Sequence, residues 1–219
     1  MKKNYFYAVL GIFVGLFLGW LVFQSLPQTK AQMVPQNTKT ISTKELNFRQ
    51  DMRKLWEEHV AWTRMYIESI AFDNPNADSN LSRLLKNQDD IGSAIKPYYG
   101  DDAGNKLTGL LKEHINTAAA LVSAAKSNDQ TALTTANDRW YKNANDIADF
   151  LSNANPNIQN SQMRTEMKNH LDILKQESTD ILNGNYDAGV TDYDNAHNQI
   201  LKMSDMISTA IIKQFPNKF

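Results

Sequence analysis

The sequence predicts an all-α protein, with one N-terminal transmembrane helix followed by an antiparallel bundle of about six helices. Three observations lead to this prediction. An uncharged apolar run lies near the N-terminus, apolar residues recur every three or four positions over the rest of the chain, and two motifs repeat about every 56 residues. A period of three and four is that of an amphipathic helix. Glycine and proline are few, which fits long helices joined by short turns.

The apolar run covers residues 5–23 and contains neither a charged residue nor a proline. At about 1.5 Å per residue, a helix of this length spans roughly 30 Å of hydrocarbon. Lys2 and Lys3, in the predicted cytoplasmic segment 1–4, place the N-terminus in the cytoplasm by the positive-inside rule. We therefore predict a single-pass protein of the cell membrane with an extracytoplasmic C-terminal domain. A cleaved signal peptide is the alternative, but the run is long and no small-x-small site directly follows it.

A stripe of glycines lies on one face of the predicted anchor, at Gly11, Gly15 and Gly19. Small residues at a spacing of four let two membrane helices approach closely, so one explanation is a homodimer formed through this face. The other explanation is that glycine is simply frequent in membrane helices. The sequence leaves both open.

Residues 24–43 separate the anchor from the rest of the chain. They are polar, contain Pro27 and Pro35, and show no apolar period, so we predict a flexible linker. The helical bundle domain is then predicted at residues 44–219.

The composition of the bundle domain excludes several classes of function. Residues 44–219 carry 19 basic and 24 acidic side chains, a net charge of −5, which argues against nucleic acid and anionic lipid as partners. The chain has no cysteine, which excludes disulfides, thiolate catalysis and cysteine-ligated zinc. No catalytic motif is found. We therefore expect a non-enzymatic binding or structural module that meets a protein or cell-envelope partner.

The repeats define the architecture of this domain. The first motif reads LWEEHV at 55–60, LLKEHI at 110–115 and EMKNHL at 166–171. The second reads LLKNQDDI at 84–91 and WYKNANDI at 140–147, with a weaker third copy near 200–207. Two motifs that recur in step indicate three helical hairpins, each with a histidine on its first helix.

Turn residues separate the predicted helices. Segments rich in Asn, Asp and Gly mark the three hairpin turns at 73–76, 127–129 and 183–185. Pro97 with Gly100, and the Asn-Pro-Asn at 155–157, are expected to separate the units. Six amphipathic helices in three antiparallel pairs would close into a bundle. A short solenoid is the alternative, but its end units would leave apolar faces exposed.

Four histidines are the candidate site residues. His59, His114 and His170 fall in register with the apolar stripes of their helices, so all three should point inward. His170 precedes Gly184 by almost the same distance along the chain as His197 follows it. In an antiparallel hairpin these two histidines would lie side by side.

Two interpretations of the histidines remain open. In the first, each buried imidazole fixes the helix register by hydrogen bonds to neighbours such as Asn87, Asp90, Asn143 or Asp146. In the second, the histidines bind a divalent metal or a small ligand together with a carboxylate from Asp90, Asp146 or Glu177. The second interpretation makes a metal- or ligand-binding sensor the alternative function. The helical metal-ligand spacings HxxxH and ExxH are missing, and no other cofactor is indicated.

Several segments also resemble a known family. The stretches LWEEHVAWTRMYIESI, RLLKNQDDIGSAIKPYYG, WYKNANDIADFL and QFPNKF resemble small helical, often membrane-anchored proteins of Bacillus-like bacteria. The resemblance covers nearly all of residues 55–219 and implies a helical fold, but the family has no established activity. Some relatives carry the names acetylglutamate kinase or glycosyltransferase. This sequence has neither a glycine-rich phosphate loop nor βαβ alternation, so no catalytic residue carries over.

Overall fold

Six α-helices and one short 3₁₀ helix account for almost all of residues 41–219, the part of the chain that the computed structural model describes. The helices are α2 (Thr43–Ala71), α3 (Ala77–Tyr99), α4 (Asp101–Lys126), α5 (Gln130–Ala154), α6 (Asn160–Leu182), α7 (Tyr186–Gln214) and the 3₁₀ helix η1 (Pro216–Lys218). No β-strand occurs in this part of the chain, so the predicted all-α class is confirmed for it.

The predicted anchor at 5–23, with its glycine stripe, and nearly all of the predicted linker lie outside the described residues. Between residues 41 and 219, no helix is both long enough and apolar enough to cross a membrane. The bundle begins at Thr43, one residue before its predicted start.

Short polar side chains cap the first turns of α2 and α5. The Ser42 hydroxyl accepts a hydrogen bond from the Glu45 backbone N–H at 3.1 Å, and the Asp129 carboxylate accepts one from Ala132 N–H at 3.0 Å. Each bond satisfies an amide that the first turn of a helix leaves without a partner, which stabilises the helix by about 1 kcal/mol.

The three hairpin turns form where the sequence predicts them. Each contains one residue with a positive φ: 53° at Asp73, 56° at Asn128 and 78° at Gly184. Asp, Asn and Gly tolerate this left-handed conformation better than other residues, which explains the composition of the turns. The turn composition thus directly sets the helix boundaries.

The break between the first two hairpins falls at Gly100, as predicted, whereas Pro97 lies inside the preceding helix rather than in the break. Helix α3 continues through Pro97 to Tyr99, and Gly100, with a φ of 87°, ends the helix. A proline removes only one N–H donor from the helix. The helical pattern resumes directly after it, because Gly100 N–H bonds the Lys96 carbonyl at 2.9 Å.

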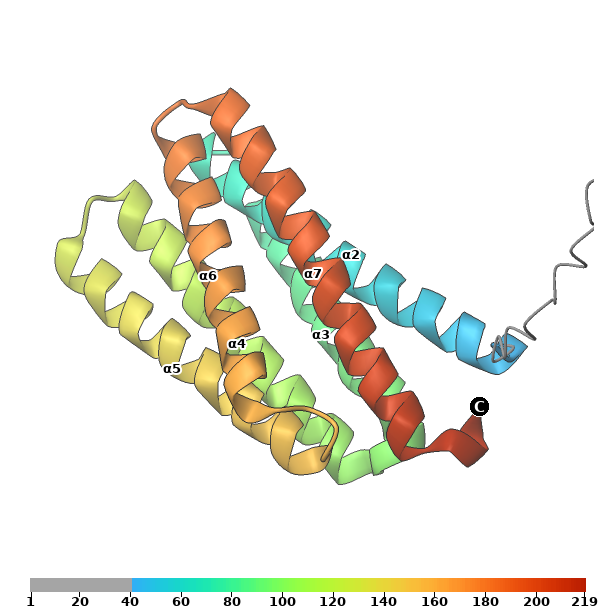
Figure 1. Ribbon diagram of the computed structural model, residues 1–219. Coiled ribbons are helices and arrows are strands. Elements are labelled where there is room, and N and C mark those ends of the chain that lie inside the picture. The colour runs from blue at the N-terminus through green and yellow to red at the C-terminus, as the bar shows by residue number, and fades with distance from the viewer. Residues whose placement is uncertain (1–40) are drawn as a thin grey trace, which may run out of the picture. The chain divides into compact units, whose positions relative to one another are not determined.

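The six helices form a closed bundle (Figure 1). Each helix packs against the next along the chain, and α7 packs against α2, so the first and last helices meet. This closure favours the predicted bundle over the solenoid. The first helices of the three hairpins, α2, α4 and α6, also contact one another and so share the centre of the bundle.

Apolar side chains from all six helices fill one continuous core. Met163, Leu171 and Ile200 are completely buried. Each such side chain stabilises the fold by about 1.5–3 kcal/mol relative to leaving it in water.

The bundle has two different ends (Figure 1). At the terminal end, α2 begins and the chain finishes, and Ser42 Oγ donates a hydrogen bond to the Phe219 carbonyl at 3.2 Å. The Phe219 ring stacks on Tyr98 and packs against Phe48, with ring centroids 5.2 and 5.0 Å apart. At the turn end lie the three hairpin turns.

Candidate functional site

Three histidines meet in the centre of the bundle. His59 on α2, His114 on α4 and His170 on α6 are only 2–3% exposed, as their places in the apolar stripes predict. The His170 ring lies between the other two, with its centroid 5.7 Å from that of His59 and 6.2 Å from that of His114.

Each of these histidines contacts a side-chain amide on the second helix of its own hairpin. The amide lies 29 residues further along the chain in all three cases and contacts the ring nitrogen Nδ1. The pairs are His59 with Gln88 at 3.2 Å, His114 with Asn143 at 2.9 Å, and His170 with Gln199 at 3.2 Å. Buried imidazoles need such partners, because an unpaired ring nitrogen is costly in an apolar core.

A second hydrogen bond ties the same two helices together. In each hairpin an amide N–H₂ group donates to a backbone carbonyl one turn before the histidine. These bonds run from Asn87 to Leu55, from Asn143 to Leu110 and from Gln199 to Glu166, each at 3.0 Å. In the second and third hairpins one amide makes both contacts, whereas in the first the adjacent residues Asn87 and Gln88 divide them.

Of these amides, Asn143 is a partner that the sequence predicts, whereas Gln88 and Gln199 are not among the predicted partners. The signal for Gln199 is present in the sequence, because this residue follows Asn143 at the spacing of the repeat and has the same amide group. A third copy of the second motif that includes Gln199 begins at 196, four positions before the predicted 200–207.

The second hydrogen bond of His114 comes from Trp140. The indole Nε1–H donates to His114 Nε2 at 3.2 Å. Since Nε2 accepts, the neutral ring carries its hydrogen on Nδ1 and donates it to Asn143 Oδ1. Both nitrogens of His114 are therefore bonded within the hairpin.

Burial keeps all three imidazoles uncharged at neutral pH. It lowers the pKa of His114 to about 3 and that of His170 to about 4. The pKa of His59 also falls well below its usual value, through burial first and then through the neighbouring histidines. A charged imidazole would lose its hydration here without gaining a counter-ion.

His197 does not join the other three, which corrects the expectation that it lies beside His170. It is partly exposed at the edge of α7, where its Nε2 lies 3.0 Å from Glu57 Oε1 on α2 and its ring stacks on Tyr193. The preceding residue, Ala196, faces the core instead. One position along a helix turns a side chain by about 100°, enough to move it from the core to the surface.

The candidate carboxylates lie elsewhere too. Asp90 and Asp146 are at the surface and form ion pairs with Lys86 and Lys142, one turn earlier on their own helices, at 2.6 Å each. Such exposed pairs contribute little stability. Neither carboxylate reaches a histidine.

Glu177 is buried, but its partner is an arginine. Its carboxylate lies 3.0 Å from Arg64 Nη1, and Arg64 also donates to the Gly189 carbonyl and to Glu68, at 2.6 Å each. Burial raises the pKa of Glu177 to about 7, against the opposing effect of Arg64. Between residues 41 and 219, no group of three or more histidine and acidic side chains is arranged to hold a metal ion.

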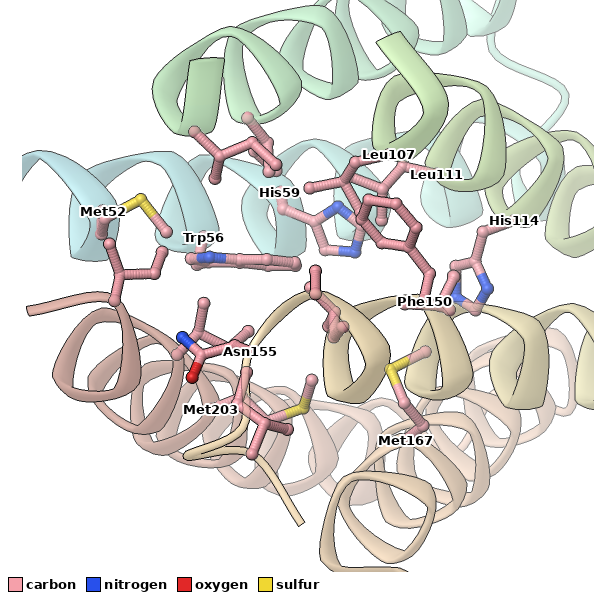
Figure 2. A pocket seen from close by; sticks show the side chains of 18 of the residues that line it. Met52, Trp56, His59, Leu107, Leu111, His114, Phe150, Asn155, Met167 and Met203 are labelled. Atoms are coloured by element: carbon pink, nitrogen blue, oxygen red, sulfur yellow. The ribbon is translucent and has the colours of Figure 1, made fainter. Parts of the chain in front are cut away.

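A cavity of about 30 Å³ adjoins the histidines (Figure 2). All three core histidines line it together with Trp56, and the rest of its wall is almost entirely apolar. One water molecule needs roughly 10–15 Å³ of such free space, so the cavity is large enough to hold one. The Trp56 indole N–H is buried without a hydrogen-bond partner among the described residues.

The fold and the site define a closed, six-helix bundle with three neutral, hydrogen-bonded histidines in its core. No model of a known protein family, no curated protein and no solved structure matches the chain.

Proposed function

We propose that this chain is a membrane-anchored, extracytoplasmic helical bundle that serves as a binding or structural module. The predicted anchor at 5–23 and the predicted linker precede a bundle that starts at Thr43. The observation that carries the proposal is the structural role of the three core histidines, His59, His114 and His170. They are buried and uncharged, and their Nδ1 atoms contact amides of the same hairpin. This arrangement supports a scaffold role over acid–base chemistry on a substrate.

We also propose that the three hairpins are copies of one structural unit. Two observations support this: both motifs recur at a regular spacing, and the histidine–amide contact recurs with a separation of 29 residues in each hairpin. Each copy supplies one inner helix and one outer helix. Stacking three such units buries inner faces that a single hairpin would expose.

An exposed apolar patch lies at the turn end of the bundle, opposite the end at which α2 begins. Phe72 and Tyr186 contact each other with ring centroids 5.7 Å apart, and Val190 lies one turn beyond Tyr186. All three side chains are more than half exposed. Aromatic residues of this kind are enriched in protein–protein contacts.

The charge around this patch indicates the chemistry of its partner. Between Lys175 and Lys202 the chain has no lysine or arginine and five acidic residues. Two of these, Glu177 and Asp180, are buried, so the acidic side chains open to a partner are Asp187 and Asp194, with Asp192 partly exposed. Beside Phe72, Lys126 is paired with Asp73. We therefore propose that the patch binds a protein segment with basic side chains beside apolar ones, since opposite charges favour encounter and like charges oppose it.

The predicted topology is tested with intact protoplasts that express the full chain. Added proteinase should digest the bundle, while a cytoplasmic control protein stays intact. Protection of residues 41–219 under these conditions would contradict the extracytoplasmic location.

The partner chemistry is tested with the detergent-solubilised chain and a fluorescent amphipathic peptide of alternating lysine and leucine. The same peptide with glutamate in place of lysine is the control ligand. The double variant Phe72→Ser, Tyr186→Ser should lose most of the binding. Leu46→Ser, which changes an exposed apolar residue at the terminal end, should retain it. Equal binding of both peptides, or self-association through the patch, would rule out this partner.

A further inference from the structure

The three core histidines differ at their second ring nitrogen, Nε2. In His114 this atom accepts a hydrogen bond from Trp140. In His170 it is buried and has no partner among residues 41–219. The residue that stands to His170 as Trp140 stands to His114 along the chain is Ala196, which has no donor to offer.

Nε2 of His170 is therefore a buried hydrogen-bond acceptor without a donor among residues 41–219. Its Nδ1 faces Gln199 Oε1, and this amide is oriented because its nitrogen donates to the Glu166 carbonyl. A neutral imidazole that donates from Nδ1 has its hydrogen there and none on Nε2. A buried acceptor left in this state costs about 1–3 kcal/mol unless something donates to it.

His59 has the opposite arrangement of hydrogens. The Gln88 amide turns its nitrogen toward His59 Nδ1, at 3.2 Å, and the same nitrogen donates to the Leu84 carbonyl at 2.8 Å. The same nitrogen also donates to Asn87 Oδ1 at 3.1 Å, so turning this amide over would set its oxygen against two acceptors. The N–H₂ group therefore faces Nδ1 of His59, and that ring nitrogen carries no hydrogen. The neutral His59 ring then carries its hydrogen on Nε2, and no protein group between residues 41 and 219 accepts that hydrogen.

A donor on His59 and an acceptor on His170 thus lie on adjacent rings, whose centroids are 5.7 Å apart. Both rings line the cavity of about 30 Å³, and Figure 2 shows the His59 ring in its wall. We propose that one water molecule binds here, accepting from His59 Nε2–H and donating to His170 Nε2.

The protonation states favour water over a metal ion at this site. A metal would need lone pairs from both rings, but His59 carries its hydrogen on the nitrogen in question. Water can accept one hydrogen bond and donate another, and buried waters typically pair polar groups in this way. This inference goes beyond the proposed function, because it assigns a ligand to the core whatever binds at the surface.

The test uses the full chain in detergent micelles, labelled with ¹⁵N-histidine. The chain has only four histidines, so each can be assigned with a single substitution. We expect hydrogens on Nδ1 of His114 and His170 and on Nε2 of His59, with a cross-relaxation peak between the His59 Nε2–H and water. A hydrogen on Nδ1 of His59, or a nitrogen–nitrogen coupling that shows a direct bond between the two rings, would overturn the proposal.

Two further measurements sharpen this test. His170→Phe removes the acceptor and should abolish the water peak of His59, whereas the matched surface change His197→Phe should leave it unaltered. Zinc added to the wild-type chain should leave the His59 and His170 nitrogen shifts unchanged. Saturable zinc-dependent shifts at both rings would show that a metal ion, and not water, binds between them.

Discussion

His114 and His170 occupy equivalent positions in consecutive hairpins, yet only His114 has both ring nitrogens bonded to protein groups among residues 41–219. Both use Nδ1 to contact an amide 29 residues further along the chain. They differ in the residue next to Nε2, which is Trp140 for His114 and Ala196 for His170. The comparison separates two roles of one motif. The Nδ1 contact sets how the two helices of a hairpin align. The residue next to Nε2 decides whether that nitrogen has a hydrogen bond to a protein group.

The largest expected effect is a loss of stability in acid. The pKa of each core histidine is lower in the folded chain than its value of about 6.5 in the unfolded chain. The unfolded chain therefore binds more protons as pH falls from about 6.5, and the free energy of unfolding decreases. At pH 5, His114 and His170 should each cost about 2 kcal/mol relative to neutral pH, and His59 acts in the same direction. Thermal unfolding of the solubilised chain, followed by circular dichroism, measures this.

Glu177 acts in the opposite direction. Its pKa is raised to about 7 in the folded chain, so the folded chain binds a proton there between pH 7 and 5. This binding stabilises the folded chain by about as much free energy as one histidine costs over the same range. We expect a net loss of about 2 kcal/mol from His114, His170 and Glu177 together, a further loss from His59, and a steeper loss in Glu177→Gln. Constant stability between pH 7 and 5 would contradict the neutral core.

The next effect is that of His114→Phe at neutral pH. The substitution leaves the Trp140 N–H and the Asn143 oxygen buried without partners. Each unpaired group costs about 1–3 kcal/mol, so the total loss should be about 2–6 kcal/mol in chemical denaturation. Addition of Trp140→Phe should recover part of this loss, because it removes one of the two unpaired groups.

His170→Phe should cost less, about 1–2 kcal/mol, because only the Gln199 oxygen loses a protein partner. It should also flatten the dependence of stability on pH by about 1.4 kcal/mol per pH unit between pH 4 and 6.5. A larger loss for His170→Phe than for His114→Phe would reverse the comparison between the two hairpins.

Much of the fold follows from the sequence because its signals are local. The Asp, Asn and Gly residues of the hairpin turns adopt left-handed conformations at Asp73, Asn128 and Gly184, so turn composition locates the helix ends. The apolar period then indicates which face of each helix is buried. The expectation for Pro97 is wrong because tertiary packing can hold a helix together across one missing N–H donor.

Less of the site could be predicted, because it depends on rotation about the helix axis. The inward position of His114 and its partner Asn143 follow from spacing. His197 is misplaced because its distance from the turn at Gly184 predicts its height in the hairpin but not the direction in which it points from α7. Tyr141, which precedes His197 by 56 residues, the spacing of the repeated motifs, is also only partly buried and bonds Asp172. The tautomers of His59 and His170 depend on amide orientations that no sequence spacing encodes.

The smallest effect should be that of His197→Ala. This histidine bonds Glu57 at a partly exposed position, and such pairs contribute about 0–1 kcal/mol. The variant should unfold within about 1 kcal/mol of the wild-type chain, and Glu57→Gln should do the same. A loss as large as that of His170→Phe would show that His197 lies in the core. If the small effect is found, the same residue type costs several-fold more in one place than in the other, because buried groups lose their partners without gaining water.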